Sequence, residues 1–288
     1  MKQTAKQKWA SLCKDPVSLL IRLAVCLAAL ITVLTIIFII AYILIKGIPY
    51  LSPDLFKWKY TSDNVSMMPA LINTLLITVI SLLFAVPAGI GSAVYLTEYA
   101  GRGNKLVELV RITTETLSGI PSIVYGLFGS LFFVKACGFG LSLLSGSLTL
   151  AIMILPLIMR TTEEALRAVP DNYREGSFGL GAGKLRTVFR IVLPSAIPGI
   201  VSGVILGIGR IIGESAALIF TAGTVAEAAK GLFSSARTLA VHMYAISGEG
   251  LYINQTYATA VILLAVVILI NSLSELISEK LGGKNKNG

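Results

Sequence analysis

The side chains of this 288-residue chain that could do chemistry are a few charged groups inside long apolar runs. Arg210 lies within the apolar run 196–222, and Glu214 follows it four positions later. An ionised side chain at the centre of a membrane span costs about 2.5–3.5 kcal/mol on insertion scales, so it marks a functional site by default. If the run is one helix, the two residues share a face and can pair. The pair then either fixes helix packing or, because a guanidinium fork suits oxyanion oxygens, forms part of an anion pathway.

The surroundings of Arg210 favour a position inside a helix bundle. Three glycines precede it at four-residue spacing on nearly the same helical stripe: Gly199, Gly203 and Gly207. Glycines at this spacing let a second helix approach closely, so we expect Arg210 to face a helix interface or a cavity rather than lipid. Arg160, just after the run 141–159, lies four residues before Glu164. It is equally consistent with a cytoplasmic anchor and with a second member of the pathway.

The run 107–134 begins with a polar stretch and then contains a Gly-Ile-Pro-Ser break at 119–122. This pattern is typical of a discontinuous helix that lines a cavity, where irregular backbone is tolerated. Glu108 and Arg111 lie near the start of the run, where a helix end in the headgroup zone explains them. Glu115 lies deeper and is predicted to line the pathway.

Composition places most of the chain inside a membrane. Hydrophobic residues make up 55% of the sequence and charged residues 14%, against about 25% charged in a typical soluble domain. A helix needs about 20 apolar residues to cross a bilayer. Six runs meet that need: 23–45, 70–96, 107–134, 141–159, 196–222 and 257–276. We predict an all-α integral membrane protein of about six transmembrane helices.

Lys and Arg are distributed unevenly between the two sides of the membrane that six spans define. Most of the 24 basic residues fall in the N-terminal tail, the second loop, the loop 160–195 and the C-terminal tail. By the positive-inside rule, both termini and this loop are predicted to be cytoplasmic, in a multi-pass membrane protein. The predicted organisation is a tail, first helix and external loop over 1–68, a core over 69–276, and a cytoplasmic tail over 277–288.

The loop 160–195 predicts two short helices joined by a glycine turn. Asp171 can cap the first helix by accepting from its free backbone amides. Gly181 and Gly183 are expected to supply a left-handed turn after it, and Pro194 to stop the second helix before the next span begins.

A spaced motif in this hairpin resembles that of permeases in binding-protein-dependent ABC importers. The family pattern is Glu-Ala-Ala, three residues, Gly, nine residues, Ile-x-Leu-Pro, and the spacing here agrees at every step. The matching residues are Glu175, Gly176, Ser177, Gly181, Ile191, Leu193 and Pro194. Gly176 and Ser177 replace the two alanines but remain small. The resemblance implies the type I ABC importer permease fold, with a coupling-helix loop that inserts into a cleft of a separate ATPase subunit.

Further segments resemble the A-type permease of phosphate importers (PstA), and the sister C-type permease shares much of the same pattern. They are 119–129, 155–156 with 160–165, and 209–216. In that family, Arg and Glu at the matching positions are implicated in phosphate passage, which corresponds to Arg210, Arg160 and Glu214 here.

The same resemblance implies a location in the bacterial inner membrane and a set of partners. They are a homologous C-type permease that forms a heterodimer with this chain, two ATPase subunits, and an extracytoplasmic phosphate-binding protein, all surrounded by membrane lipid. No cofactor is expected on this chain, because ATP is used by the partner ATPase. The alternatives are a permease for another oxyanion, such as sulfate, molybdate or phosphonate, and a stand-alone secondary transporter.

Missing motifs disfavour other classes of function. The chain has no Gly-x-x-x-x-Gly-Lys-Ser/Thr phosphate loop, no His-Glu-x-x-His and no Gly-x-Ser-x-Gly. Three cysteines without paired spacing and a single histidine predict no metal site. The basic residues form no single patch, so no nucleic-acid partner is expected. We therefore predict a transport subunit that is not itself an enzyme.

Overall fold

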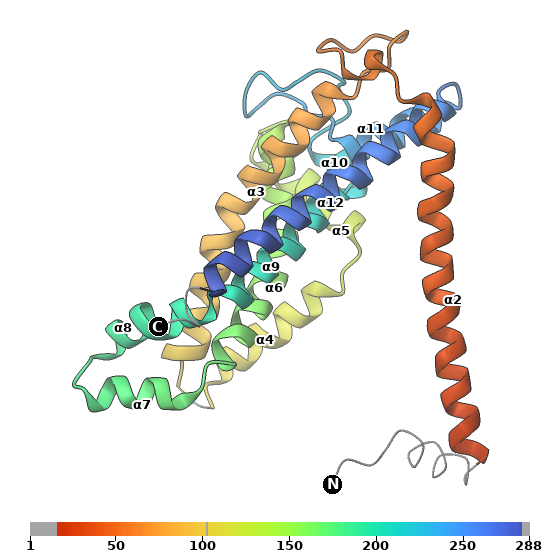
Figure 1. Cartoon of the computed structure of the whole chain (residues 1–288). Helices are drawn as coiled ribbons and strands as arrows, with labels where there is room; N and C mark the ends of the chain where they lie inside the picture. Colours follow the sequence, from red (N-terminus) through yellow and green to blue (C-terminus); the bar gives the residue numbers. More distant parts are fainter. Residues whose placement is uncertain (1–15, 102, 284–288) are drawn as a thin grey trace.

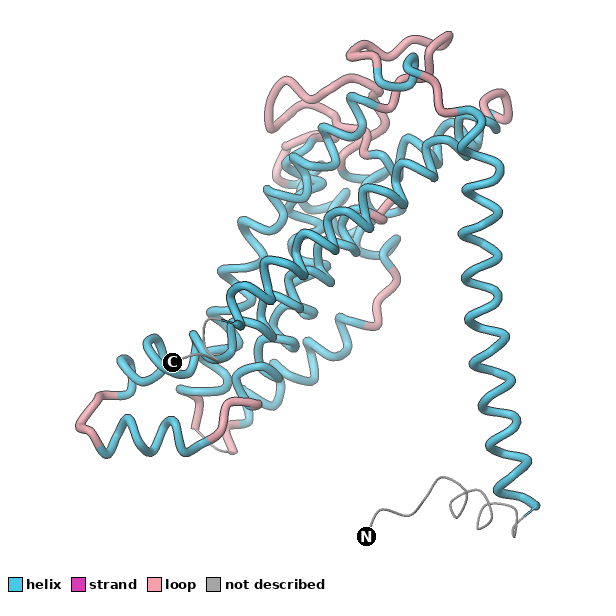
Figure 2. The backbone as a smooth tube through the Cα atoms, in the orientation of Figure 1, coloured by secondary structure: helices cyan, strands magenta, loops and turns pink. Residues whose placement is uncertain are grey.

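The structure, a computed structural model, describes residues 16–101 and 103–283, and all regular elements in these ranges are helices (Figures 1 and 2). The α-helices are α2 (Pro16–Gly47), α3 (Met68–Val94), α4 (Lys105–Ser118), α5 (Ser122–Gly129), α6 (Leu143–Arg167), α7 (Asp171–Gly179), α8 (Lys184–Thr187), α9 (Leu193–Ile212), α10 (Ala216–Thr221), α11 (Leu239–Glu249) and α12 (Ile253–Gly283). The 3₁₀ turns are η1 (Ile48–Tyr50) and η2 (Pro53–Phe56), and the π-helical segments are η3 (Tyr95–Tyr99), η4 (Ser130–Ala136) and η5 (Val188–Val192). The predictions for residues 1–15, Arg102 and residues 284–288 fall outside the described ranges.

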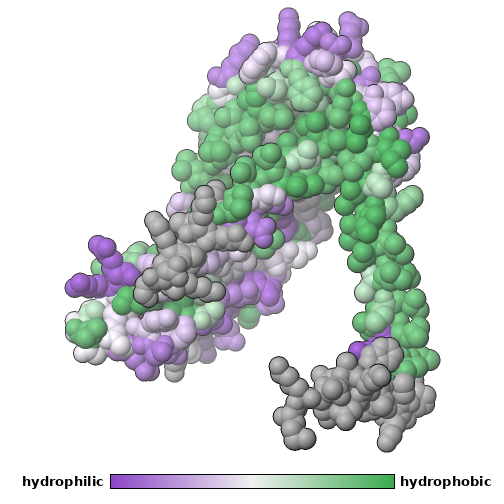
Figure 3. Space-filling model, viewed as in Figure 1, coloured by the Kyte–Doolittle hydropathy of each residue, from purple (hydrophilic) through white to green (hydrophobic). Residues whose placement is uncertain are grey.

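Five helical stretches are long and apolar enough to cross a membrane: Val17–Tyr50, Met68–Tyr99, Leu143–Arg167, Lys184–Ile212 and Ile253–Leu273. A sixth candidate is the pair Lys105–Ser118 and Ser122–Ala136, which is bent by 105°. The prediction of an all-α protein with about six transmembrane helices is confirmed over the described residues. Figure 3 shows apolar side chains over the middle of the molecule and along α2. Hydrophilic side chains gather toward the two ends of the molecule.

The bend between α4 and α5 follows from the local sequence. Gly119 ends α4, and Pro121, which has no N–H to donate, stands immediately before α5. The hydroxyl of Tyr125 donates to the carbonyl oxygen of Leu117 at 2.8 Å, which satisfies a backbone group near the break. The predicted discontinuous helix in the run 107–134 is confirmed.

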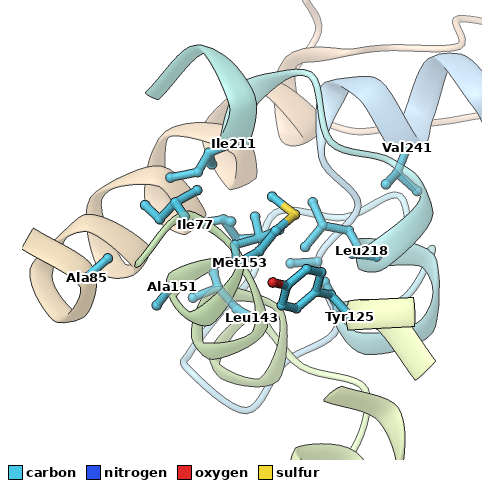
Figure 4. Close-up of a cluster of buried hydrophobic side chains, with 14 of the residues drawn as sticks. Ile77, Ala85, Tyr125, Leu143, Ala151, Met153, Ile211, Leu218 and Val241 are labelled. Carbon is cyan, nitrogen blue, oxygen red and sulfur yellow. The ribbon is translucent and has the colours of Figure 1, made fainter. Parts of the chain in front are cut away.

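The helix α6 is the centre of the bundle. Its residues Leu150, Ile154 and Ile158 are fully buried. Figure 4 shows Met153 and other buried side chains of α6 gathered with side chains from α3, α5, α9, α10 and α11, namely Ile77, Tyr125, Ile211, Leu218 and Val241. The elements around α6 therefore share one apolar core.

The helix α3 lies close against α6. A Cβ atom added at Gly89 of α3 would lie 2.7 Å from Cγ2 of Ile158, so only glycine fits there without a shift. Nearby, the hydroxyl of Ser81 donates to the carbonyl oxygen of Ser147 at 3.0 Å. These two contacts fix the position of α3 on α6.

The glycine stripe of α9 lies against another face of α6, as predicted. A Cβ atom at Gly199 would lie 2.7 Å from Cβ of Ala165, and one at Gly203 would lie 2.6 Å from Cβ of Thr161. Both distances are too short for real side chains, so the two helices approach this closely because the glycines have none.

The run 196–222 forms two helices instead of the single one that was expected. The helix α9 ends at Ile212, Gly213 is its C-cap, and α10 begins at Ala216. The predicted pairing of Arg210 with Glu214 is wrong, because the break at Gly213 takes the two residues off a common helical face. No ion pair joins them in the described ranges.

The helices α7 and α8 form a hairpin at the end of the molecule opposite α11 (Figure 1). Gly181 has a φ of 84° and supplies the predicted left-handed turn, whereas Gly183 has a φ of −74° and does not. The predicted capping role of Asp171 is also wrong. Pro170 occupies the N-cap of α7, and the Asp171 carboxylate instead accepts from Nη1 of Arg174 at 3.1 Å.

The second arm of the hairpin continues without a stop into the membrane span. The helical stretch Lys184–Ile212 contains α8, η5 and α9. The prediction that Pro194 ends the second helix is therefore wrong. Pro194 lies in the first turn of α9, directly after the π-helical η5, and such a widened turn accommodates the proline ring and its missing N–H.

The helix α2 leads away from the bundle and meets it near its C-terminal end (Figure 1). The hydroxyl oxygens of Tyr42 and Tyr257 lie 3.4 Å apart, and Gly47 packs against the backbone of Tyr257. In the most apolar 18-residue stretch of α2, 0% of the residues are buried in the molecule. The first span therefore contacts the bundle near its C-terminal end, where it packs on α12.

The close contact of α9 with α6 gives a first prediction. Gly203→Ala should lower the stability of the protein by about 1–3 kcal/mol, because the new methyl group overpacks against Thr161. The matched variant Gly209→Ala meets only Asn271 Oδ1, at 3.9 Å, and should leave stability unchanged or slightly raised, since alanine favours helix. Thermal unfolding of both variants in detergent measures the difference. Equal unfolding temperatures would contradict the packing described here.

Candidate functional site

A cavity of about 370 Å³ opens where α4, α6 and α9 meet. It is lined by three of the four residues predicted to form the pathway, namely Arg210, Arg160 and Glu115, while Glu214 is not part of its lining. The polar side chains of Thr114 and Ser118 also line it. The bend after α4 and the glycine stripe of α9 bring these segments, which are distant in sequence, to one place.

The charged groups of the cavity lining are four arginines and three glutamates. They are Arg111, Arg160, Arg167, Arg210, Glu115, Glu163 and Glu164. With every group ionised, the lining carries a net positive charge. Because such a lining attracts anions and repels cations, the sign of its charge suits an anionic solute.

Glu163 is the centre of an ion-pair network at one side of the cavity. Its Oε1 lies 2.7 Å from Nη2 of Arg111 on α4 and 3.2 Å from Nη2 of Arg167 on α6. Arg111 also donates from Nε to the same oxygen at 2.9 Å. The Glu163 side chain is 16% exposed, so solvent screens this network only partly. The network ties α4 to α6.

Arg160 forms a separate pair with Glu164, with Nε 3.0 Å from Oε1. Both side chains are more than half exposed, and an exposed pair four residues apart on a helix contributes little to stability. A solute that enters the cavity can therefore replace Glu164 as the partner of Arg160 at small cost.

Arg210 differs from the other three arginines of the cavity. It lies in the last turn of α9, and no carboxylate in the described ranges forms an ion pair with it. Glu115 likewise forms no ion pair within those ranges. A cation and a carboxylate that have no ion-pair partner among the described residues thus line the same cavity.

Glu214 has a local structural role that the sequence did not indicate. Its Oε1 accepts a hydrogen bond from the backbone N–H of Ala217 at 3.0 Å, and the residue is 9% exposed. The carboxylate therefore satisfies a free amide at the start of α10. This contact fixes the chain just beyond Arg210.

Three charged residues of the cavity were not among the predicted members of the site, namely Arg111, Glu163 and Arg167. A signal for two of them was present, because Glu163 and Arg167 are four residues apart and face the same side of α6. Arg111 was attributed to the headgroup zone, since its partner lies 52 positions away in the sequence. Only the contact between α4 and α6 brings them together.

The α7–α8 hairpin and the helical stretch that follows it contain the residues of the predicted coupling loop. The hydroxyls of Ser177 and Thr187 are 2.8 Å apart and buried, and they join the two arms. Gly176 faces open space, where an added Cβ would meet no atom within 4 Å. Near the turn, large apolar side chains are exposed, with Leu180 at 91%, Leu185 at 66% and Phe189 at 52%. An apolar surface of this kind at the tip of a hairpin marks a protein interaction site.

In the described ranges, no group of three or more His, Cys, Asp or Glu side chains is arranged to hold a metal ion. The side chains that line the cavity offer guanidinium, carboxylate and hydroxyl groups as hydrogen-bonding partners for a polar solute.

The fold, the polar cavity and the exposed hairpin together define a multi-pass membrane subunit of a transport system. The profile of the family described as "Binding-protein-dependent transport system inner membrane component" matches residues 85–283. The chain belongs to this family and is a permease subunit of an ABC importer.

Relatives of this chain include the probable ABC transporter permease protein YqgI of Bacillus subtilis, which is 37% identical over 73% of this chain and 76% of YqgI. The phosphate transport system permease protein PstA of Mycobacterium leprae is 45% identical over 54% of this chain, and the PstA of Pasteurella multocida is 40% identical over 62%. The match spans 50% of the former protein and 63% of the latter.

Solved structures with the same fold include permeases of two ABC transporters. A chain of the inward-facing MetNI methionine ABC transporter superposes with a TM-score of 0.56 and 22% identity, over 74% of this chain and 93% of the other. A chain of the bacterial alginate ABC transporter, in complex with alginate pentasaccharide-bound periplasmic protein, gives 0.65 and 15% over 95% and 98%. The fold is that of type I ABC importer permeases, as predicted.

The contact of Glu214 with α10 gives a second prediction. Glu214→Gln keeps an oxygen acceptor for the Ala217 amide and should retain wild-type thermal stability in detergent. Glu214→Ala leaves that buried amide unpaired and should cost about 1–3 kcal/mol. Equal losses in both variants would contradict the capping role, because they would mean that the charge, not the acceptor, stabilises the fold.

Proposed function

We propose that this chain is one of two permease halves of an ATP-driven importer of inorganic phosphate, and that the anion passes through the cavity at Arg210. The observation that carries the proposal is the cavity's unpaired Arg210 within a lining of net positive charge. A guanidinium offers several donors in a fixed plane, which matches two oxygens of a tetrahedral oxyanion at once. The relatives named phosphate permeases support the choice of anion.

The carboxylates of the cavity keep the binding weak enough for transport. Glu164 and Glu163 compete with the anion for Arg160, Arg111 and Arg167, so a bound anion is not held by four free cations. A transport site must bind its solute weakly enough to release it on the other side of the membrane. Arg210 attracts the anion. The paired arginines provide further contacts, which the anion can exchange with the glutamates as it passes.

Glu115, which has no ion-pair partner in the described ranges, supports phosphate over sulfate and molybdate. Phosphate keeps at least one proton near neutral pH, and its P–OH group can donate a hydrogen bond to a carboxylate. Sulfate and molybdate carry no such proton at that pH, so a carboxylate near them only repels. The combination of Arg210 with Glu115 therefore suits a partly protonated anion.

The α7–α8 hairpin is proposed as the docking site for a separate ATPase subunit. Glu175, Gly176, Ser177 and Gly181 lie on its first arm and turn, and Ile191, Leu193 and Pro194 lie on the arm that continues into α9. The proposed assembly contains this chain, a homologous C-type permease, two ATPase subunits and an extracytoplasmic phosphate-binding protein. Because α8, η5 and α9 are one continuous helical stretch, movement of the hairpin reaches Arg210 directly.

Uptake by the complete assembly tests the substrate. In proteoliposomes that contain all subunits, labelled phosphate should accumulate only with ATP, and excess sulfate or molybdate should not compete. Arg210→Gln should reduce uptake about ten- to hundredfold, the loss expected for one or more charge-assisted hydrogen bonds, while the complex still assembles. Normal uptake by this variant would remove Arg210 from the pathway. ATP-dependent uptake of another oxyanion would replace phosphate, and phosphate flux without ATP would favour a secondary transporter.

The exposed apolar tip of the hairpin gives a separate prediction about docking. Leu180→Glu places a charge in the proposed interface, and the amount of ATPase subunit that co-purifies with this chain should fall at least about tenfold. Leu251→Glu is the matched control, because Leu251 is also highly exposed, at 81%, but lies just after α11 at the opposite end of the molecule (Figure 1). Loss of the ATPase from both variants, or from neither, would contradict the assignment of the hairpin.

A further inference from the structure

The α7–α8 hairpin is tied to the end of α3 by an ion pair outside the motif of the coupling loop. Arg174 of α7 donates to Oε1 of Glu98 in η3 from both Nη2, at 2.7 Å, and Nε, at 3.2 Å. The Arg174 side chain is 16% exposed and that of Glu98 is 9% exposed. A forked contact to one carboxylate, largely removed from water, fixes orientation as well as distance.

Arg174 also holds the end of α6. It donates from Nη1 to the carbonyl oxygen of Val169 at 2.8 Å and from Nη2 to that of Leu166 at 2.9 Å. These carbonyls lie at and just beyond the C-terminal end of α6, where helical carbonyls lack intrahelical partners. One guanidinium therefore joins three elements, namely α7, α6 and the end of α3.

The second arm of the hairpin reaches the same segment by an independent contact. The ammonium group of Lys184, the first residue of α8, lies 5.2 Å from the centre of the Tyr99 ring. Tyr99 is the last residue of η3 and follows Glu98 directly. Both arms of the hairpin thus hold η3, one through a carboxylate and the other through an aromatic ring.

Both arms of the hairpin are joined to the cavity through the chain itself. The α8 arm is continuous with α9, which carries Arg210, and the α7 arm follows α6, which carries Arg160, Glu163 and Glu164, after residues 168–170. The end of α3 is instead linked to the hairpin across space, through Glu98 and Tyr99 of η3. Leu96 of η3 lines the cavity. If the Arg174–Glu98 pair is broken, α6 and α9 can follow the hairpin while the η3 end of α3 stays behind.

We propose that Glu98 and Arg174 are positioning residues that make the η3 end of α3 move together with α6 and α9 when the hairpin moves, so that Leu96 changes position with the rest of the cavity lining. The inference rests on the proposed function, since it requires that an ATPase moves the hairpin. Neither residue touches the transported anion. Their role is to couple ATP hydrolysis to the change of the cavity.

The ratio of ATP hydrolysed to anion transported by the complete assembly tests the pair. Glu98→Gln should keep assembly and ATP hydrolysis but consume about tenfold more ATP per anion, in line with the coupling energies of linked elements. Asp171→Asn is the matched control, because Asp171 contacts the same arginine at 3.1 Å but lies on α7 itself, is 84% exposed and spans no interface. Its ratio should equal that of the wild type.

A reversible cross-link separates coupling from folding in the same sample. In a chain whose Cys13, Cys26 and Cys137 are serine, Glu98→Cys and Arg174→Cys are joined by a flexible, reducible linker between the two thiols. With the linker intact, the ATP-to-anion ratio should approach that of the wild type, and it should rise about tenfold after reduction.

The outcomes distinguish the inference from the function on which it rests. A ratio that is the same before and after reduction, or an equal effect of Glu98→Gln and Asp171→Asn, overturns the role of the pair while ATP-dependent uptake by the wild type stands. A wild-type assembly without ATP-dependent uptake of any anion overturns the proposed function and the inference with it. If phosphate is not the anion, the same ratio is measured with the oxyanion that competes for uptake.

Discussion

The cost of placing ionised side chains among apolar helices is the constraint on which this structure depends. An arginine in a membrane span must face other protein groups or water, because hydrocarbon offers no partner for its donors. The chain meets this requirement with a break between α4 and α5 and with glycines on one face of α9. The bend after α4 brings Glu115 and Ser118 to the cavity, and the glycines of α9 allow α6 to approach so that Arg160 and Arg210 line the same space.

Ion pairs then distribute the charge of the cavity unequally. Glu163 pairs with two arginines at once and Glu164 with a third, which leaves Arg210 as the cavity arginine without a carboxylate partner in the described ranges. A similar arrangement occurs at the hairpin, where Arg174 is held by Glu98 and by carbonyl groups. The paired arginines join elements of the fold to one another, and the proposed anion contact falls to Arg210.

Local sequence patterns predicted those features that depend on a few neighbouring residues. Apolar run length gave the spans, the Gly-Ile-Pro-Ser segment gave the break at 119–122, and the spacing of Gly199 and Gly203 gave the close contact with α6. The left-handed turn at Gly181 belongs to the same group. Each of these features depends on the hydrophobicity, backbone freedom or hydrogen-bonding capacity of a residue type, and these properties can be read directly from the sequence.

The errors arose where a tertiary contact or a change of helix type decided the outcome. A proline usually ends a helix, but the π-helical η5 before Pro194 lets the chain continue. A four-residue spacing usually pairs charges, but the break at Gly213 separates Arg210 from Glu214, whose carboxylate turns to a backbone amide of α10. The pairs Arg111–Glu163 and Arg174–Glu98 join distant segments, so no local pattern could indicate them.

Arg210 is proposed to set a positive field in the cavity, and the charge preference of a reactive probe measures that field directly. In the complete assembly with Cys13, Cys26 and Cys137 changed to serine, Ser118→Cys places a thiol in the cavity lining beside an intact Arg210. An anionic thiol reagent should react about tenfold faster than a cationic reagent of similar size. Phosphate should slow the reaction of the anionic reagent, and Arg210→Gln should make the two rates equal. Equal rates for the two reagents, or a preference for the anionic reagent that survives Arg210→Gln, would show that Arg210 does not set the field in the cavity.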